Sequence, residues 1–123
     1  MALSISGFDA ALDYRIVHQT AGSPTANENV TQSSGDLLSV AINNSTGTAA
    51  CYVKIFDGTD PTPGTSIPQF VLRCPSAALQ KYEIPEGFSF TNLNFWVTKL
   101  ASPTDTTSPT VSSGGVGVTL ITK

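Results

Sequence analysis

Three runs of alternating apolar and polar residues within residues 37–74 constrain the fold more than any other part of the chain. In the second run, CYVKIFD over residues 51–57, Cys, Val and Ile occupy alternate positions, with Tyr, Lys and Phe between them. Successive side chains of a β-strand point to opposite faces, so alternation with a period of two is typical of a half-buried strand. The stretch therefore predicts strands over residues 37–43, 51–57 and 67–74.

The second and third runs can be paired as a hairpin in a register that places their apolar residues on a common face. Paired residue numbers then add up to 125. A shift by one residue would turn half of these side chains to the wrong face, which favours this register. The inner-face pairs are Val53 with Leu72, Ile55 with Phe70, and Cys51 with Cys74. Between the first and second runs, residues 43–47 (NNSTG) predict another hairpin.

The rest of the chain continues as short alternating segments separated by turn-forming ones. Weak alternation is compatible with a first strand over residues 14–19, and a turn is expected at 85–87. Further strands are expected over residues 80–84, 88–90, 93–100 and 116–123. Because no helical period of any length is present, the sequence predicts an all-β, antiparallel, jelly-roll-like β-sandwich of about seven to eight strands.

The predicted core consists of apolar residues that share the inner face of these strands. They are Leu38, Val40, Ile42, Val53, Ile55, Phe70, Leu72, Phe95, Val97, Val118 and Leu120.

The length of 123 residues suits one domain with a modest core, assigned to residues 14–123. Residues 1–13 have small side chains and no clear period, and we expect an N-terminal arm or tail there. An arm would pack on its own domain or on a neighbour, and Leu3, Ile5 and Phe8 are its candidate contact residues.

The composition narrows the range of functions. Only 12% of residues are charged and the net charge is -3, so the chain offers no basic patch for nucleic acid or an anionic membrane. The N-terminus lacks the basic start and apolar centre of a secretion signal, and we expect folding in a reducing cytosol. Cys51 and Cys74 are therefore expected as buried thiols, although the hairpin register would also allow a disulfide.

The ionisable residues give no pattern that predicts catalysis or metal binding. His18, the single histidine, belongs to the expected inward side of its strand and is interpreted as structural. Asp57, Asp60 and Asp105 could in principle share a calcium ion, but turn chemistry explains those in DGTDP. Glu83 and Glu86 are close enough in sequence to suggest the two acids of a glycosidase, but they flank an expected turn and are interpreted as solvated. We expect no catalytic residue, no cofactor and no metal, and hence no enzyme.

Three aromatic residues fall opposite the predicted core face: Tyr52, Phe56 and Trp96. Exposed aromatic clusters usually mark an interface. Alternatively, long loops or the N-terminal segment cover this face. We therefore treat the three as candidate interface residues while keeping the second interpretation open.

Residues 36–123 resemble small β-sandwich structural proteins of tailed bacteriophages. The similarity lies in a Tyr-Val-Lys-Ile run, a Thr-Pro-Gly-Thr loop with a strand that starts at a proline, a Pro-x-Gly turn and a WVT strand. Such domains occur in capsid decoration (cement) proteins and in tail or fibre components.

This resemblance implies a virion structural protein that decorates a phage head. Its partners would be the major capsid protein and further copies of itself, as a homotrimer on the capsid surface, after synthesis in the cytoplasm of the host bacterium. Two alternatives remain. One is a tail, baseplate or fibre module, and the other is a carbohydrate-binding sandwich in which Trp96 and Tyr52 stack on sugar rings.

Overall fold

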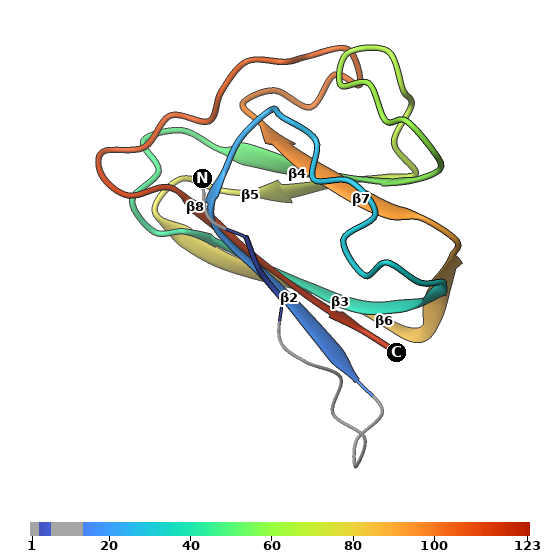
Figure 1. Ribbon diagram of the computed structural model, residues 1–123. Helices are drawn as coiled ribbons and strands as arrows, with labels where there is room; N and C mark the ends of the chain where they lie inside the picture. The colour runs from blue at the N-terminus through green and yellow to red at the C-terminus, as the bar shows by residue number, and fades with distance from the viewer. Residues whose placement is uncertain (1–2, 6–13) are drawn as a thin grey trace.

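The computed structural model describes residues 3–5 and 14–123, which form two antiparallel sheets packed face to face (Figure 1). The predicted all-β sandwich is confirmed. Its strands are β1 (Leu3–Ile5), β2 (Arg15–Gly22), β3 (Gly35–Asn44), β4 (Cys51–Asp57), β5 (Phe70–Cys74), β6 (Ala78–Phe90), β7 (Leu93–Thr98) and β8 (Val116–Thr122).

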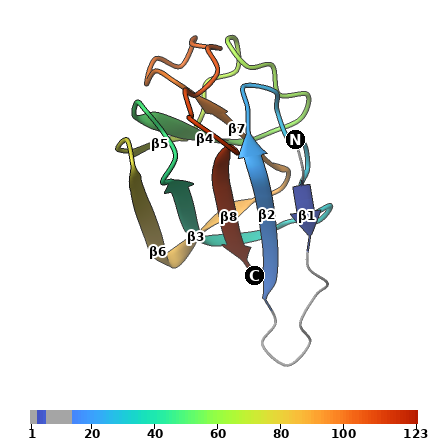
Figure 2. The ribbon, with the colours of Figure 1, turned by 90° about the vertical axis from the view of Figure 1, so that its left-hand side faces the viewer.

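The order of the strands in the two sheets is that of a hairpin-like ribbon wound around the core. One sheet has the order β1-β2-β8-β3-β6 (Figure 2), and the other has the order β5-β4-β7. Strand β3 pairs with β6 while β4 pairs with β5, and β7 and β8 then return along β4 and β3. This winding is the predicted jelly-roll-like topology.

An irregular segment takes the place of a fourth strand in the smaller sheet. Residues 23–30 run along β7, and the amide of Asn27 donates to the carbonyl of Phe95 at 2.8 Å while the amide of Phe95 donates back at 3.1 Å. The Val30 amide donates to the Leu93 carbonyl at 2.9 Å. The loop between β2 and β3 thus shields the edge of β7.

The β4–β5 hairpin has the predicted register, including Cys51 opposite Cys74. The predicted hairpin at residues 43–47 is wrong, because β3 and β4 belong to opposite sheets. Both edges of β3 are occupied by β6 and β8. The side chain of Asn44 holds this crossover, since its Nδ2 donates to the carbonyls of Ala49 at 3.0 Å and Pro75 at 2.9 Å.

The predicted turn at residues 85–87 is also wrong, because β6 continues through it to Phe90. The register changes from Leu37 opposite Phe88 to Ser39 opposite Glu83, so Leu38 alone faces residues 84–87. Gly87 adopts a φ of 78°, a conformation that glycine allows without a steric penalty. The sequence Pro-Glu-Gly therefore forms a bulge within a strand instead of ending one.

The inner faces of both sheets supply one core. Val40, Ile42, Val53, Ile55, Phe95, Val97, Val118 and Leu120 are buried, and Phe70 and Leu72 pack against them partly exposed. The prediction that Leu38 belongs to the core is wrong. Leu38 is only half-buried, and Leu37 occupies the core position in its place, because the bulge changes the alternation of β3 at this point.

The orientation of β2 was predicted wrongly. Val17 and Gln19 face the core with 0% exposure, whereas His18 is half-buried on the outer face. The inward glutamine is satisfied by Asn27. Each side chain donates to the other, at 3.3 Å from Gln19 Nε2 and 3.0 Å from Asn27 Nδ2. This reciprocal amide pair makes a polar residue acceptable in the core.

Candidate interaction surfaces

The outer face of the three-stranded sheet is covered by two loops, residues 58–69 and 99–115, which we call the cap (Figure 1). The loops touch each other, since a Cβ on Gly64 would lie 3.0 Å from Thr106 Cγ2. Trp96, on β7 beneath the cap, has 0% exposure. Of the two interpretations kept open for this face, coverage by long loops is therefore the one that holds for Trp96, and Trp96 is not offered to a partner.

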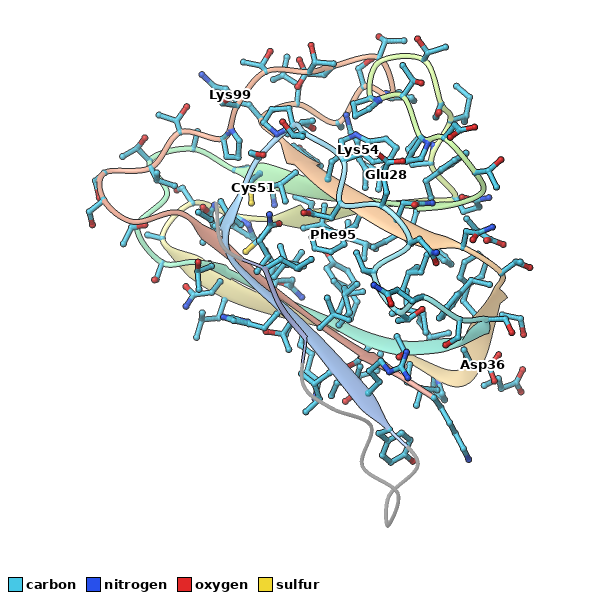
Figure 3. The ribbon with its side chains drawn as sticks, in the orientation of Figure 1. Glu28, Asp36, Cys51, Lys54, Phe95 and Lys99 are labelled. Carbon is cyan, nitrogen blue, oxygen red and sulfur yellow. The ribbon has the colours of Figure 1, made fainter. Side chains whose placement is uncertain are left out.

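Lys54 links the sheet to the cap from below. It lies on β4 opposite Trp96, with 0% exposure, on the side of the sheet that faces the loops (Figure 3). Its Nζ donates to the carbonyls of Ser102 at 2.5 Å and Asp105 at 3.3 Å. Burial lowers the pKa of this amine, and the negative charge of Asp105 partly opposes that shift.

Asp105 orders the cap from within. Its Oδ2 accepts a hydrogen bond from the Leu100 amide at 3.0 Å, and its Oδ1 accepts one from Thr107 Oγ1 at 2.7 Å. Desolvation acts to raise the pKa of Asp105, but the hydrogen bonds from Thr107 and Leu100 outweigh it, and the pKa is lowered. The 99–115 loop of the cap is consequently held by hydrogen bonds to the sheet and within itself.

The other two aromatic candidates remain partly accessible. Phe56 packs on Trp96 with ring centroids 6.2 Å apart at an interplanar angle of 53°. Tyr52 is half-buried and lies opposite Arg73 on β5 and Thr98 on β7. Neither forms an open aromatic platform together with Trp96.

The N-terminal candidates belong to the edge of the five-stranded sheet. Leu3 pairs with Gln19 and Ile5 pairs with Val17, so β1 extends the sheet beyond β2. Leu3 is 38% exposed. Phe8 lies outside the described residues.

The outer face of the five-stranded sheet carries a groove of about 490 Å³. It crosses β2, β8, β3 and β6, and His18 and Leu79 are among the residues that line it. This groove was not predicted, because His18 was assigned to the core side of its strand and the strand expected over residues 80–84 left out Leu79. The available signal was that Leu79 shares a strand face with the charged residues Lys81 and Glu83, which indicates an outward-facing position.

In the part of the chain that the structure describes, the four most exposed large apolar side chains are those of Ile16, Ile67, Leu79 and Leu100, with exposures from 42% to 72%. Ile67 and Leu100 belong to the cap, and they are 64% and 52% exposed. None of the four was singled out from the sequence. The loop residues Ile67 and Leu100 have no period that indicates exposure, Ile16 was placed on the face of β2 expected to point inward, and Leu79 was left outside the strand expected at residues 80–84. The cap therefore presents two exposed apolar side chains to solvent. The outer face of the five-stranded sheet presents the other two, Ile16 and Leu79.

The two cysteines are buried, and Asp57 holds a turn by hydrogen bonds. Cys51 and Cys74 are buried free thiols, and burial raises the pKa of Cys51 to about 12. Asp57 Oδ1 accepts hydrogen bonds from the Thr91 and Asn92 amides, both at 3.0 Å. Over residues 3–5 and 14–123, no three His, Cys, Asp or Glu side chains gather as a metal site would require.

The described part of the chain contains no helix long and apolar enough to span a membrane. Comparison of the chain with protein-family models, with curated proteins and with solved structures finds no match.

Proposed function

We propose that this chain is a non-enzymatic structural protein of a phage virion that binds the outside of the head and stabilises it. Three features support the proposal. Residues 36–123 resemble phage decoration and tail domains, the fold is a jelly roll, and the cap presents exposed apolar side chains on an ordered loop surface.

The observation that carries the proposal is the construction of the cap. Loops normally lose conformational entropy when they bind, which weakens affinity. Here Lys54 and Asp105 already tie the 99–115 loop to the sheet and to itself. In the 58–69 loop the Thr62 amide donates to Ser66 Oγ at 2.8 Å, while Ile67 and Leu100 stay exposed. A pre-ordered surface with exposed apolar residues is suited to docking on another protein.

The mechanism of stabilisation is interface burial. A copy that contacts two subunits of the major capsid protein makes their separation more costly, because ligand binding to the assembled state favours that state. Assembly as a homotrimer would add avidity to individually weak contacts. Tyr52 and Phe56 remain candidate contacts beside the cap, and Leu3 remains one at the edge of the sheet.

Co-sedimentation with purified heads of the phage that encodes the chain tests the proposal. We expect Ile67→Asp and Leu100→Asp to abolish co-sedimentation. The matched control Leu79→Asp, on the opposite face, should retain it. Loss in the control alone would refute the assignment to the cap. Binding to purified tails but never to heads would replace decoration with the tail or fibre function.

The carbohydrate-binding alternative does not fit the pair of residues first considered for it. Trp96 has 0% exposure and lies under the cap, so it cannot stack on a sugar together with Tyr52.

A further inference from the structure

The groove on the five-stranded sheet is built by two adjacent rows of outward-facing residues. The strand register places His18, Thr119, Ala41 and Lys81 side by side across β2, β8, β3 and β6. Neighbouring strands are about 4.8 Å apart, so three spacings separate the outer two strands by roughly 14 Å. The second row contains Gly117, Asn43 and Leu79.

The floor of the groove is lower than its sides because its central side chains are small. Gly117 and Ala41 lie on the two middle strands, and a Cβ at Gly117 would come within 3.3 Å of Asn43 Cβ. The side chains on the two outer strands of the groove are larger than those of its floor. His18 rises from β2, and Leu79 rises from β6 with 72% exposure. A volume of about 490 Å³ is within the usual range of ligand sites.

The polar groups of the groove are oriented by the protein and keep unused hydrogen-bonding capacity. His18 Nδ1 lies 2.8 Å from Thr119 Oγ1, which leaves Nε2 as the ring nitrogen for a ligand. Asn43 Oδ1 accepts a hydrogen bond from the Ser45 amide at 3.0 Å, so its NH2 group can still donate outward. Thr20 adds a hydroxyl at one end.

The charge and polarity of the lining select the ligand class. Among residues 3–5 and 14–123, no Asp or Glu lines the groove, and the one lysine of its lining, Lys81, is paired with Glu83 at 3.2 Å. A polyanion or a metal cation would thus find little counter-charge. Leu79 is the one large exposed apolar side chain of the lining, which is too few for the apolar stripe of an amphipathic helix.

We propose that this groove binds a neutral saccharide. Ring hydroxyls would hydrogen-bond to His18, Asn43 and Thr20, and an apolar C–H face of the sugar would pack on Leu79 and Ala41. The site is separate from the cap, so it does not depend on the proposed docking to a capsid.

Amide chemical shifts of the full chain, titrated with malto-, cello- and chito-oligosaccharides, test this proposal. We expect at least one neutral oligosaccharide to perturb amides of β2, β3, β6 and β8 around the groove. Ala41→Ile, which fills the floor, should abolish these changes. Val71→Thr, on the outer face of the other sheet, is the matched control and should leave them unchanged.

A second variant keeps the test informative if Ala41→Ile fails to fold. Thr119→Val removes the hydroxyl that orients His18 with almost no change in volume, and should weaken binding severalfold. Perturbations elsewhere, no response to any neutral sugar, or a response to oligogalacturonates alone would each overturn the proposal.

Discussion

The outer faces of the two sheets differ although their inner faces share one core. On the three-stranded sheet, Lys54 and Trp96 are completely buried beneath the cap. On the five-stranded sheet, His18 is half-buried beside an open groove and Leu79 is 72% exposed. The face of a strand does not determine exposure by itself, because a loop distant in sequence can cover one outer face and leave the other bare.

The largest expected effect follows from the burial of Trp96. Trp96→Ala should lower the free energy of unfolding by about 3 to 5 kcal/mol, because it leaves a cavity under the cap. The matched change on the open face, Leu79→Ala, should cost no more than about 0.5 kcal/mol. Urea denaturation measures both. Equal costs would show that the two outer faces do not differ in burial.

The next effect concerns the two lysines that lie on opposite outer faces. Lys54→Met should lower the free energy of unfolding by about 1 to 3 kcal/mol, since the carbonyls of Ser102 and Asp105 lose a donor. Amide hydrogen exchange at Leu100 should also become faster. Lys81→Met, which removes an exposed ion pair, should change stability by less than about 1 kcal/mol. An unchanged exchange rate at Leu100 in Lys54→Met would argue against the role of Lys54 in ordering the cap.

The lowered pKa of Lys54 predicts that the stability it confers rises with pH in an alkaline window. As pH rises through the lowered pKa of the folded state, the folded protein releases a proton that the unfolded chain keeps until about 10.5. The wild type should therefore gain stability relative to Lys54→Met in this window, by at most about 1.4 kcal/mol per pH unit.

Cys51 contributes an opposite trend that cancels in this difference. Its pKa of about 12 lies above the ordinary 9.0, so its stabilisation is present below pH 9.0 and is lost as pH rises toward about 12, in both proteins alike. Urea denaturation at several alkaline pH values gives the difference. A constant difference between the wild type and Lys54→Met would contradict the burial of the amine.

The smallest effect is expected on the bare face. Ile16→Thr should change the free energy of unfolding by no more than about 0.5 kcal/mol, because this β2 side chain is 42% exposed and points away from the core. Thermal unfolding followed by circular dichroism is sufficient. A cost comparable to that of Trp96→Ala would mean that another segment covers the groove face in solution.

Alternation within single segments was sufficient to predict pairing between strands that are neighbours in the sequence, but not pairing between distant strands. The β4–β5 register could be derived because both strands alternate and pair with each other across one loop. The partners of β3 could not, since β6 and β8 come much later in the chain and compete with β4 for its edges. Leu38 was misplaced because alternation does not indicate where a bulge changes the register.

The candidate surfaces depended still more on distant contacts. Gln19 appears outward-facing in the sequence, and its burial is explained by Asn27 alone. Trp96 appears available until the loop containing Ser102 and Asp105 is seen to lie over its neighbour Lys54. The groove required the register of four strands, so neither its small floor nor its walls formed a pattern within any single segment.

A cryo-electron microscopy reconstruction of phage heads incubated with the protein tests the proposed function most directly. We expect added density on the outside of the shell, with the cap against the capsid and the groove of the five-stranded sheet facing solvent. Heads that gain no density, or density in which the five-stranded sheet contacts the shell, would contradict the proposal.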